Sequence, residues 1–266
     1  MNEVIALPNR IGLKLMNAIR FAGGFGHLVG TTAKELFIPP FPLRLTLQQI
    51  YAIGVESFVL VLITGLATGS VMALQFGYGL ARFGGTLYVP KLSSLAILRE
   101  MGPVFTSLLV AGRIGSGMAS EIASMKVTQQ IDAIRALGTS PIQRIVIPRL
   151  VACMIALPLL TLMADYVAMI GAMLIAKFEL NIGFNFFIAK VLETLTLADL
   201  FTGMAKTMVF AFFIAITACW KGLNTEGGTQ GVGQTTTWVV VMSSIFIMVA
   251  DFFLSKFFLV TVYPKY

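Results

Sequence analysis

The feature that most constrains this chain is a set of five apolar runs, each long enough to cross a lipid bilayer. A membrane core needs roughly 20 apolar residues per helical span. With 57% hydrophobic and 12% charged residues among 266, the chain is predicted to be an all-α integral membrane protein with five transmembrane helices. The runs lie near Ala52–Leu74, Met101–Ala119, Leu150–Ala176, Phe201–Trp220 and Thr237–Val262.

The distribution of Lys and Arg predicts the orientation, because short cytoplasmic loops are enriched in both residues. Five spans put the two termini on opposite sides. With the N-terminus inside, ten basic residues fall on inner segments, namely Arg10, Lys14, Arg20, Lys34, Arg44, Lys126, Arg135, Arg144, Arg149 and Lys221. Six fall outside, namely Arg82, Lys91, Arg99, Lys177, Lys190 and Lys265. The expected topology is therefore N-in and C-out.

The N-terminal region has a different pattern. From Arg10 to Ala22, apolar residues recur at helical spacing while Arg10 and Lys14 take another face, which predicts a helix lying along the membrane interface. We expect one domain over residues 1–266, with an interfacial region at 1–50 and the transmembrane bundle at 51–266. The net charge of +7 is spread over loops, which favours anionic lipid headgroups over nucleic acid as the partner of these charges.

Charged residues inside the spans are costly in hydrocarbon and are therefore candidates for function. Arg113, Asp165 and Asp251 fall near the bilayer middle, and Arg113 could pair with either acid, as a structural ion pair or in transport. Lys206 lies nearer the outer side of the fourth span. Arg99 and Glu100 would sit at the outer mouth of the second span.

Two ladders of small residues at four-residue spacing predict close helix packing in the first and second spans. One ladder could instead form the subunit interface of a homodimer. The ladders are Gly65, Gly69 and Ala73, and Ala111, Gly115 and Ala119.

The segment Gly228–Thr235 reads GxxxxGQT and lacks the lysine of the phosphate-binding GxxxxGK[ST]. It also joins two predicted spans, so we interpret it as a helix connection. Any ATP used by the protein must then be bound by another polypeptide. His27 is the only histidine, which excludes a two-histidine metal site or an HExxH hydrolase within one chain, and we expect no metal.

A polar island, Glu121–Gly138, interrupts the apolar pattern on the predicted cytoplasmic side. Asp132-Ala133-Ile134 followed by Gly138 approximates the EAAxxxG pattern of ABC-importer permeases. A short amphipathic helix ended by Gly138, with Pro141 beyond, could project into a groove on an ATPase.

The longer stretch from Arg99 to Pro148 resembles the MlaE family of permeases, and it reads REMGPVFTSLLVAGRIGSGMASEIASMKVTQQIDAIRALGTSPIQRIVIP. The later GGTQGVGQTTTWVVVMSS resembles the family's loop between the fourth and fifth spans. These permeases are the membrane subunits of MCE-associated lipid transporters. The resemblance implies a homodimer in a Gram-negative inner membrane, with cytoplasmic ATPase subunits that use ATP and magnesium. It also implies a STAS-domain protein, a periplasmic MCE protein and phospholipid as substrate.

Carried onto this sequence, the resemblance makes Glu121–Gly138 the coupling helix region. The expected ATPase-coupling residues are Glu121, Lys126, Gln130, Asp132, Arg135 and Gly138. The residues expected to line the lipid cavity are Met72, Leu74, Tyr78, Leu80, Tyr88, Arg99, Glu100 and Lys206.

Two other function classes stay open on the residues alone. A gradient-driven secondary transporter would use Asp165 or Asp251 to couple transport of a lipid or amphiphile to protons or sodium. A membrane-embedded lipid enzyme would need a Ser/His pair, HExxH or paired carboxylates, and we find none of these motifs, so we expect a transport subunit rather than an enzyme.

Overall fold

The computed structural model describes residues 16, 19, 22–39 and 41–262 of the chain. These residues form helices and no strand. Apart from Val262 at the end of the fifth, the five predicted spans lie within helical segments long and apolar enough to cross a membrane, which confirms the number of spans. The segments are α2 (Leu43–Ala81), a composite second span (Thr86–Val127), a third span over Ile142–Phe178, α9 (Leu197–Leu223) and α10 (Gly228–Thr261).

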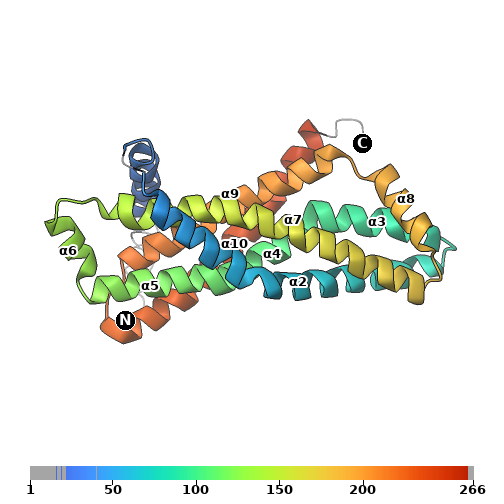
Figure 1. The fold of residues 1–266 in the computed structure, drawn as a ribbon, viewed down its shortest axis with the longest axis horizontal. Helices are drawn as coiled ribbons and strands as arrows, with labels where there is room; N and C mark the ends of the chain where they lie inside the picture. The colour runs from blue at the N-terminus through green and yellow to red at the C-terminus, as the bar shows by residue number, and fades with distance from the viewer. Residues whose placement is uncertain (1–15, 17–18, 20–21, 40, 263–266) are drawn as a thin grey trace, which may run out of the picture.

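The spans run side by side along the longest axis of the molecule (Figure 1). Even α9, with 27 residues, reaches about 40 Å at 1.5 Å per residue, against roughly 30 Å of hydrocarbon. The 39 residues of α2 reach about 58 Å. The spans are therefore longer than the hydrocarbon thickness requires.

The second span is a chain of short helices rather than one α-helix. It comprises η1 (Thr86–Tyr88), α3 (Val89–Ala96), η2 (Ile97–Met101), α4 (Gly102–Val110), η3 (Ala111–Gly115) and α5 (Ser116–Val127). Both η2 and η3 are π-helical. A π turn adds one residue, which rotates the faces beyond it by about 100° relative to a straight α-helix, and such turns are frequent at functional sites. Arg99 and Glu100 lie on η2, and Arg113 lies on η3.

The polar island is split into two helical parts. Its first part continues α5 to Val127, and Gln129 then adopts a left-handed backbone before α6 (Gln130–Ala136). Gly138, with a φ of 73°, ends α6 as predicted. Its N–H donates to the Arg135 carbonyl at 2.9 Å, and the Thr139 N–H donates to the Ile134 carbonyl at 3.3 Å, the hydrogen-bond pair of a Schellman motif. A π turn, η4 (Ile142–Val146), leads into α7 (Ile147–Phe178).

Both small-residue ladders pack inside the protomer, which confirms the interpretation as bundle packing. The first ladder lies on α7: a Cβ added at Gly69 would come within 1.8 Å of the Ala168 carbonyl oxygen. The second faces α9 and α10, where a Cβ at Gly115 would meet Ile214 and Val239. Backbones approach this closely only where side chains are absent or small.

The two ends of the bundle carry different elements (Figure 1). One end carries α6, the loop between α9 and α10, and a helix over residues 22–35 that is steeply inclined to the bundle axis. The other carries η1, the end of α10 and α8 (Phe184–Thr194), an element that the sequence analysis did not anticipate. The predicted interfacial helix Arg10–Ala22 lies largely outside the described residues.

Candidate functional site

A buried charge cluster joins the second, fourth and fifth spans near the α8 end of the bundle. Its centre is Lys206, whose side chain is only 3% exposed. Lys206 Nζ lies 2.8 Å from Glu100 Oε2, 3.1 Å from Asp251 Oδ1 and 2.7 Å from Ser255 Oγ. It also donates to the Arg99 carbonyl at 2.9 Å. A buried ammonium is tolerated only with such partners, because an unpaired charge in a low-dielectric interior is far more costly.

Arg99 extends the cluster outward to a carboxylate that the sequence analysis missed. Its Nη2 lies 2.6 Å from Oδ1 of Asp199, whose side chain is fully buried. The other oxygen of Asp199 accepts hydrogen bonds from the Thr196 N–H at 2.8 Å and the Thr196 hydroxyl at 2.7 Å. The sequence signal was available: Thr196-x-x-Asp199 is a capping box at the start of α9.

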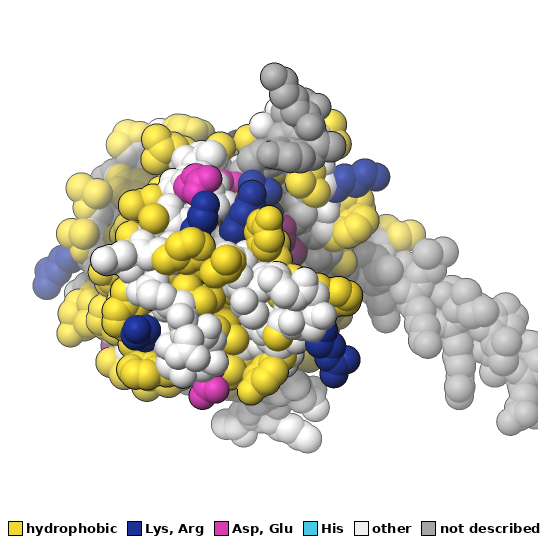
Figure 2. All heavy atoms as spheres, turned by 90° about the vertical axis from the view of Figure 1, so that its right-hand side faces the viewer, with side chains coloured by type: hydrophobic (Ala, Val, Ile, Leu, Met, Phe, Trp, Pro, Cys, Tyr) yellow, Lys and Arg dark blue, Asp and Glu magenta, His cyan; other side chains and the backbone are white. Residues whose placement is uncertain are grey.

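A cavity of about 960 Å³ opens at this end of the molecule, between α3, α8 and the end of α10. Tyr88 and Arg99 line it, together with Lys91 and Lys190, which add positive charge. Figure 2 looks onto this end and shows basic and acidic side chains lying among apolar ones. Glu193 also lines the cavity, and the hydrogen bond from Lys190 lowers the pKa of the Glu193 carboxyl, which favours its ionised form. This one negative charge stands against the three positive charges of Lys91, Arg99 and Lys190.

The structure divides the eight predicted lipid-cavity residues into three groups. Tyr88 and Arg99 line the cavity, and Glu100 and Lys206 are joined to it through Arg99. Four residues of α2 do not line this cavity of the single protomer, and their place in a lipid cavity stays a prediction. The glycine face of α2 is turned to α7, and Leu80 packs into the apolar cluster that contains Val89 and Phe187 rather than into the cavity. These four are Met72, Leu74, Tyr78 and Leu80.

The possible pairing of Arg113 with Asp165 or Asp251 is wrong. Arg113 instead donates to the Glu56 backbone carbonyl, and its Nη2 lies 3.9 Å from the Glu56 carboxylate. The π turns of the second span change the direction of Arg113 from that of a straight helix. Asp251 belongs to the Lys206 cluster. Asp165 is buried against Gly102, where an added Cβ would meet its Oδ1.

At the opposite end, three of the predicted coupling residues form one exposed polar group around α6. Asp132 accepts from Lys126 at 3.3 Å and from Arg135 at 3.4 Å. Gln130, at the start of α6, is exposed as well, and Gly138 caps the helix. Asp132 and Arg135 are 49% and 61% exposed and are therefore accessible to a partner, although Arg135 also lines a cavity between α6 and the end of α9.

Glu121 has a different place from the other coupling residues. It lies 2.6 Å from Arg149, whose side chain is 7% exposed, at the root of the hairpin that carries α6. Arg149 also donates to the Ile145 carbonyl at 3.0 Å. The Glu121–Arg149 ion pair therefore joins α5 to α7. Sequence analysis had counted Arg149 only as a basic residue of the inner segments.

Gly228–Thr235 opens α10 directly after the loop from α9, with no preceding strand. Gly227 and Gly228 have φ values of 89° and 63°, which a sharp reversal of the chain requires. The connection itself is the short stretch between Leu223 and Gly228, and Gly228–Thr235 forms the first turns of α10 rather than the connection that the sequence analysis expected.

Comparison with known proteins decides the family. The Permease MlaE family model matches residues 46–257. The chain belongs to the MlaE permease family. A probable ABC transporter permease protein from Rickettsia typhi is 34% identical over 95% of this chain and 98% of its own length. One from Synechocystis is 40% identical over 80% and 81% of the two chains.

Protein TRIGALACTOSYLDIACYLGLYCEROL 1, chloroplastic, from Arabidopsis thaliana is 39% identical over 81% of this chain and 61% of its own length. This permease is thus a multi-pass membrane protein of an ABC transporter, a class in which an ATPase partner drives transport. The alternatives of a gradient-driven carrier and a membrane enzyme do not fit this family. The match begins at residue 46, so the helix over residues 22–35 lies outside it.

Proposed function

We propose that this permease moves phospholipids between the inner membrane of a Gram-negative bacterium and a periplasmic MCE protein, contributing to outer-membrane lipid asymmetry. The observation that carries the proposal is the cavity with a basic rim above the buried charge cluster. Arg99 lies in both. A guanidinium suits a phosphate group, and the surrounding apolar side chains suit acyl chains.

The family and the exposed polar group around α6 support the rest of the proposed assembly. Two copies of the permease, with single domains over residues 1–266, would stand N-in and C-out. Two ATPase subunits, with a STAS-domain protein bound to them, would hold α6 and use ATP and magnesium. The name of the Arabidopsis relative is that of a diacylglycerol lipid, which supports a lipid substrate.

In this mechanism, ATP binding closes the ATPases and pushes the two copies of α6 together. The Glu121–Arg149 ion pair links that movement to α5 and α7, because it joins both helices at the root of the hairpin. α5 is continuous with the span that carries Arg99 and Glu100 at its other end. Collapse of the outer cavity lowers its affinity for lipid, and transport needs two states that differ in this affinity.

The test is to place a negative charge on the cavity wall. Tyr88→Glu should reduce the phospholipid retained by the purified transporter about tenfold, because a carboxylate repels the lipid phosphate. Lipid extracted from the complex is measured by mass spectrometry, and ATPase co-purification is measured alongside. The matched control is Phe83→Glu, at an exposed residue of the same end that does not line the cavity. Equal lipid retention by both variants, with the ATPase bound, would contradict a phospholipid site here.

A further inference from the structure

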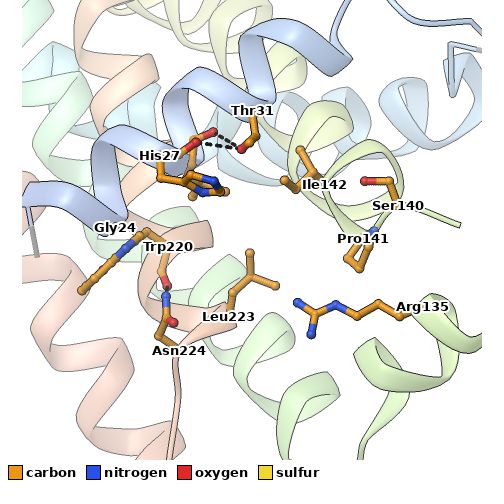
Figure 3. Close-up of a pocket in the computed structure, with 11 residues that line it drawn as sticks. Gly24, His27, Thr31, Arg135, Ser140, Pro141, Ile142, Trp220, Leu223 and Asn224 are labelled. Atoms are coloured by element: carbon orange, nitrogen blue, oxygen red, sulfur yellow. Dashed lines mark hydrogen bonds between the residues drawn. The ribbon is translucent and has the colours of Figure 1, made fainter. Parts of the chain in front are cut away.

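A second cavity, of about 650 Å³, lies at the α6 end of the bundle and has no part in the lipid path proposed above. Three elements enclose it: the helix over residues 22–35, the segment from α6 to η4, and the end of α9. Figure 3 shows His27 and Thr31 on one side, Arg135 on another, and Trp220 and Asn224 at the end of α9. Its volume is within the range of small-molecule sites.

Arg135 gives the lining of this second cavity a positive charge. The Arg135 guanidinium extends toward Leu223 across the space that His27 also faces (Figure 3). Two carboxylates contact lining residues: Asp132 lies 3.4 Å from Arg135, and Glu35 accepts a 2.5 Å hydrogen bond from the Ser140 hydroxyl. Neither acid lines the cavity. A guanidinium presents five N–H donors and remains charged, so the cavity favours an anion with several acceptor oxygens.

The position of the second cavity relates it to the membrane surface. The rings of Trp220 and Trp238 pack with their planes tilted by 39° and their centroids 5.8 Å apart, and Lys221 Nζ lies 5.4 Å from the Trp238 ring centre. Tryptophan and lysine at a span end are typical of the interface between hydrocarbon and water. The cavity also has an apolar side, formed by Leu28, Ile142 and Leu223. A ligand with a charged head and an apolar tail fits this combination.

The enclosing elements are held to one another independently of any ligand. Ser140 donates to Glu35, and the Gln143 amide donates to the Ile38 carbonyl at 3.0 Å. Gly24 lies against the Trp220 indole, where an added Cβ would be 3.0 Å from Nε1. The cavity is thus a formed feature of the joint between the helix over residues 22–35 and the hairpin that carries α6.

We propose that this cavity binds the phosphate headgroup of an anionic phospholipid from the inner leaflet. Arg135 and His27 hold the phosphate, and the apolar side takes the glycerol and the first part of the acyl chains. A lipid bound there ties the coupling helix to the helix over residues 22–35, so the anionic lipid content of the membrane affects the position of α6. The group recognised is a phosphate, which either a lipid headgroup or a soluble phosphate compound could supply.

The experiment uses the full transporter in nanodiscs of phosphatidylcholine containing a photoactivatable phosphatidylglycerol. Cross-linked peptides are mapped by mass spectrometry, which separates this site (residues 24–31 and 135–142) from the outer cavity (residues 87–99). Thr31→Trp fills the cavity, and His27→Glu places a carboxylate in it. Both should reduce cross-linking at this site at least fivefold and leave cross-linking at the outer cavity unchanged. Lys34→Gln is the matched control, because it removes a positive charge from the same helix at an exposed residue outside the cavity.

Competition separates the sources of the phosphate. Loss of the cross-link only to unlabelled phosphatidylglycerol identifies the lipid, whereas loss to glycerol phosphate as well supports a phosphate site filled from solution. The proposal is overturned if no cross-link maps to this site, if the ATPase subunit occupies it instead, or if His27→Glu and Lys34→Gln behave alike. If cross-linking is absent at this site but normal at the outer cavity, the proposed transport function stands.

Discussion

At the residue scale, the buried cluster shows how a membrane interior holds several charges together. Lys206 and Arg99 face the carboxylates of Glu100, Asp199 and Asp251. Each cation has at least one partner within hydrogen-bonding distance, and Ser255 supplies a further hydroxyl. Replacing such a cluster with apolar residues can be neutral, but removing one member leaves a buried charge uncompensated.

Lys206→Met should therefore destabilise the folded permease by about 3–5 kcal/mol, since Glu100 and Asp251 would lose their shared cation. The measurement is thermal unfolding of the purified permease in detergent. Lys256→Met is the matched control, because Lys256 lies on the same helix as Asp251 but is exposed. Adding Glu100→Gln and Asp251→Asn to Lys206→Met should restore part of the loss. Equal stability of the two lysine variants would refute the structural role of the cluster.

At the element scale, the fold depends on close backbone contact between α2 and α7. Gly65 and Gly69 of α2 lie directly on the backbone of Ala164 and Ala168 in α7. Gly171 of α7 lies in the same way against the Leu66 carbonyl of α2. Lipid supplies no hydrophobic drive for helix association, so these contacts hold the two spans together by van der Waals packing.

Gly69→Ala should destabilise the α2–α7 pair by about 1–3 kcal/mol or more, because overpacking forces the backbones apart. Gly54→Ala changes the same residue type on the same helix, where nothing lies within 4 Å of the added Cβ, and should have little effect. Chemical unfolding monitored by circular dichroism compares the two variants. A smaller loss for Gly69→Ala than for Gly54→Ala would argue against this packing.

At the scale of the whole molecule, the two functional ends are separated by the length of the bundle (Figure 1). Arg99 and Glu100 occur early in the second span and Glu121 near its other end. The one composite helix therefore joins the charge cluster to the hairpin of α6. Its two π turns interrupt the regular α-helical register between these ends, and such turns are frequent at functional sites.

The proposed N-in topology predicts opposite labelling of two introduced cysteines. Gly85→Cys, at the α8 end, should react with a membrane-impermeant maleimide in intact spheroplasts. Ser124→Cys, an exposed residue near α6, should react only after the membrane is opened. The native Cys153 and Cys219 are both buried and give the background rate. The reverse labelling pattern would invert the assignment of α6 to the cytoplasm.

The sequence by itself determined the five spans, the packing role of the small residues and the end of α6 at Gly138. These properties are local: hydropathy, four-residue spacing and a glycine after a helix are visible within short windows. The MlaE resemblance of Arg99–Pro148 also predicted the family correctly. The exposed group around Asp132 needed only the short distance along the chain from Lys126 to Arg135.

Only the tertiary structure decided which charges meet. Lys206 pairs with Glu100 and Arg99 with Asp199, residues 106 and 100 positions apart in sequence. Those pairs depend on the rotation of each helix about its axis, and the π turns at Ile97–Met101 and Ala111–Gly115 change that rotation without a clear hydropathy signal. The same cause turned Arg113 to Glu56. Which residues of two helices face each other depends on how the helices pack, and the periodicity of one segment does not predict it.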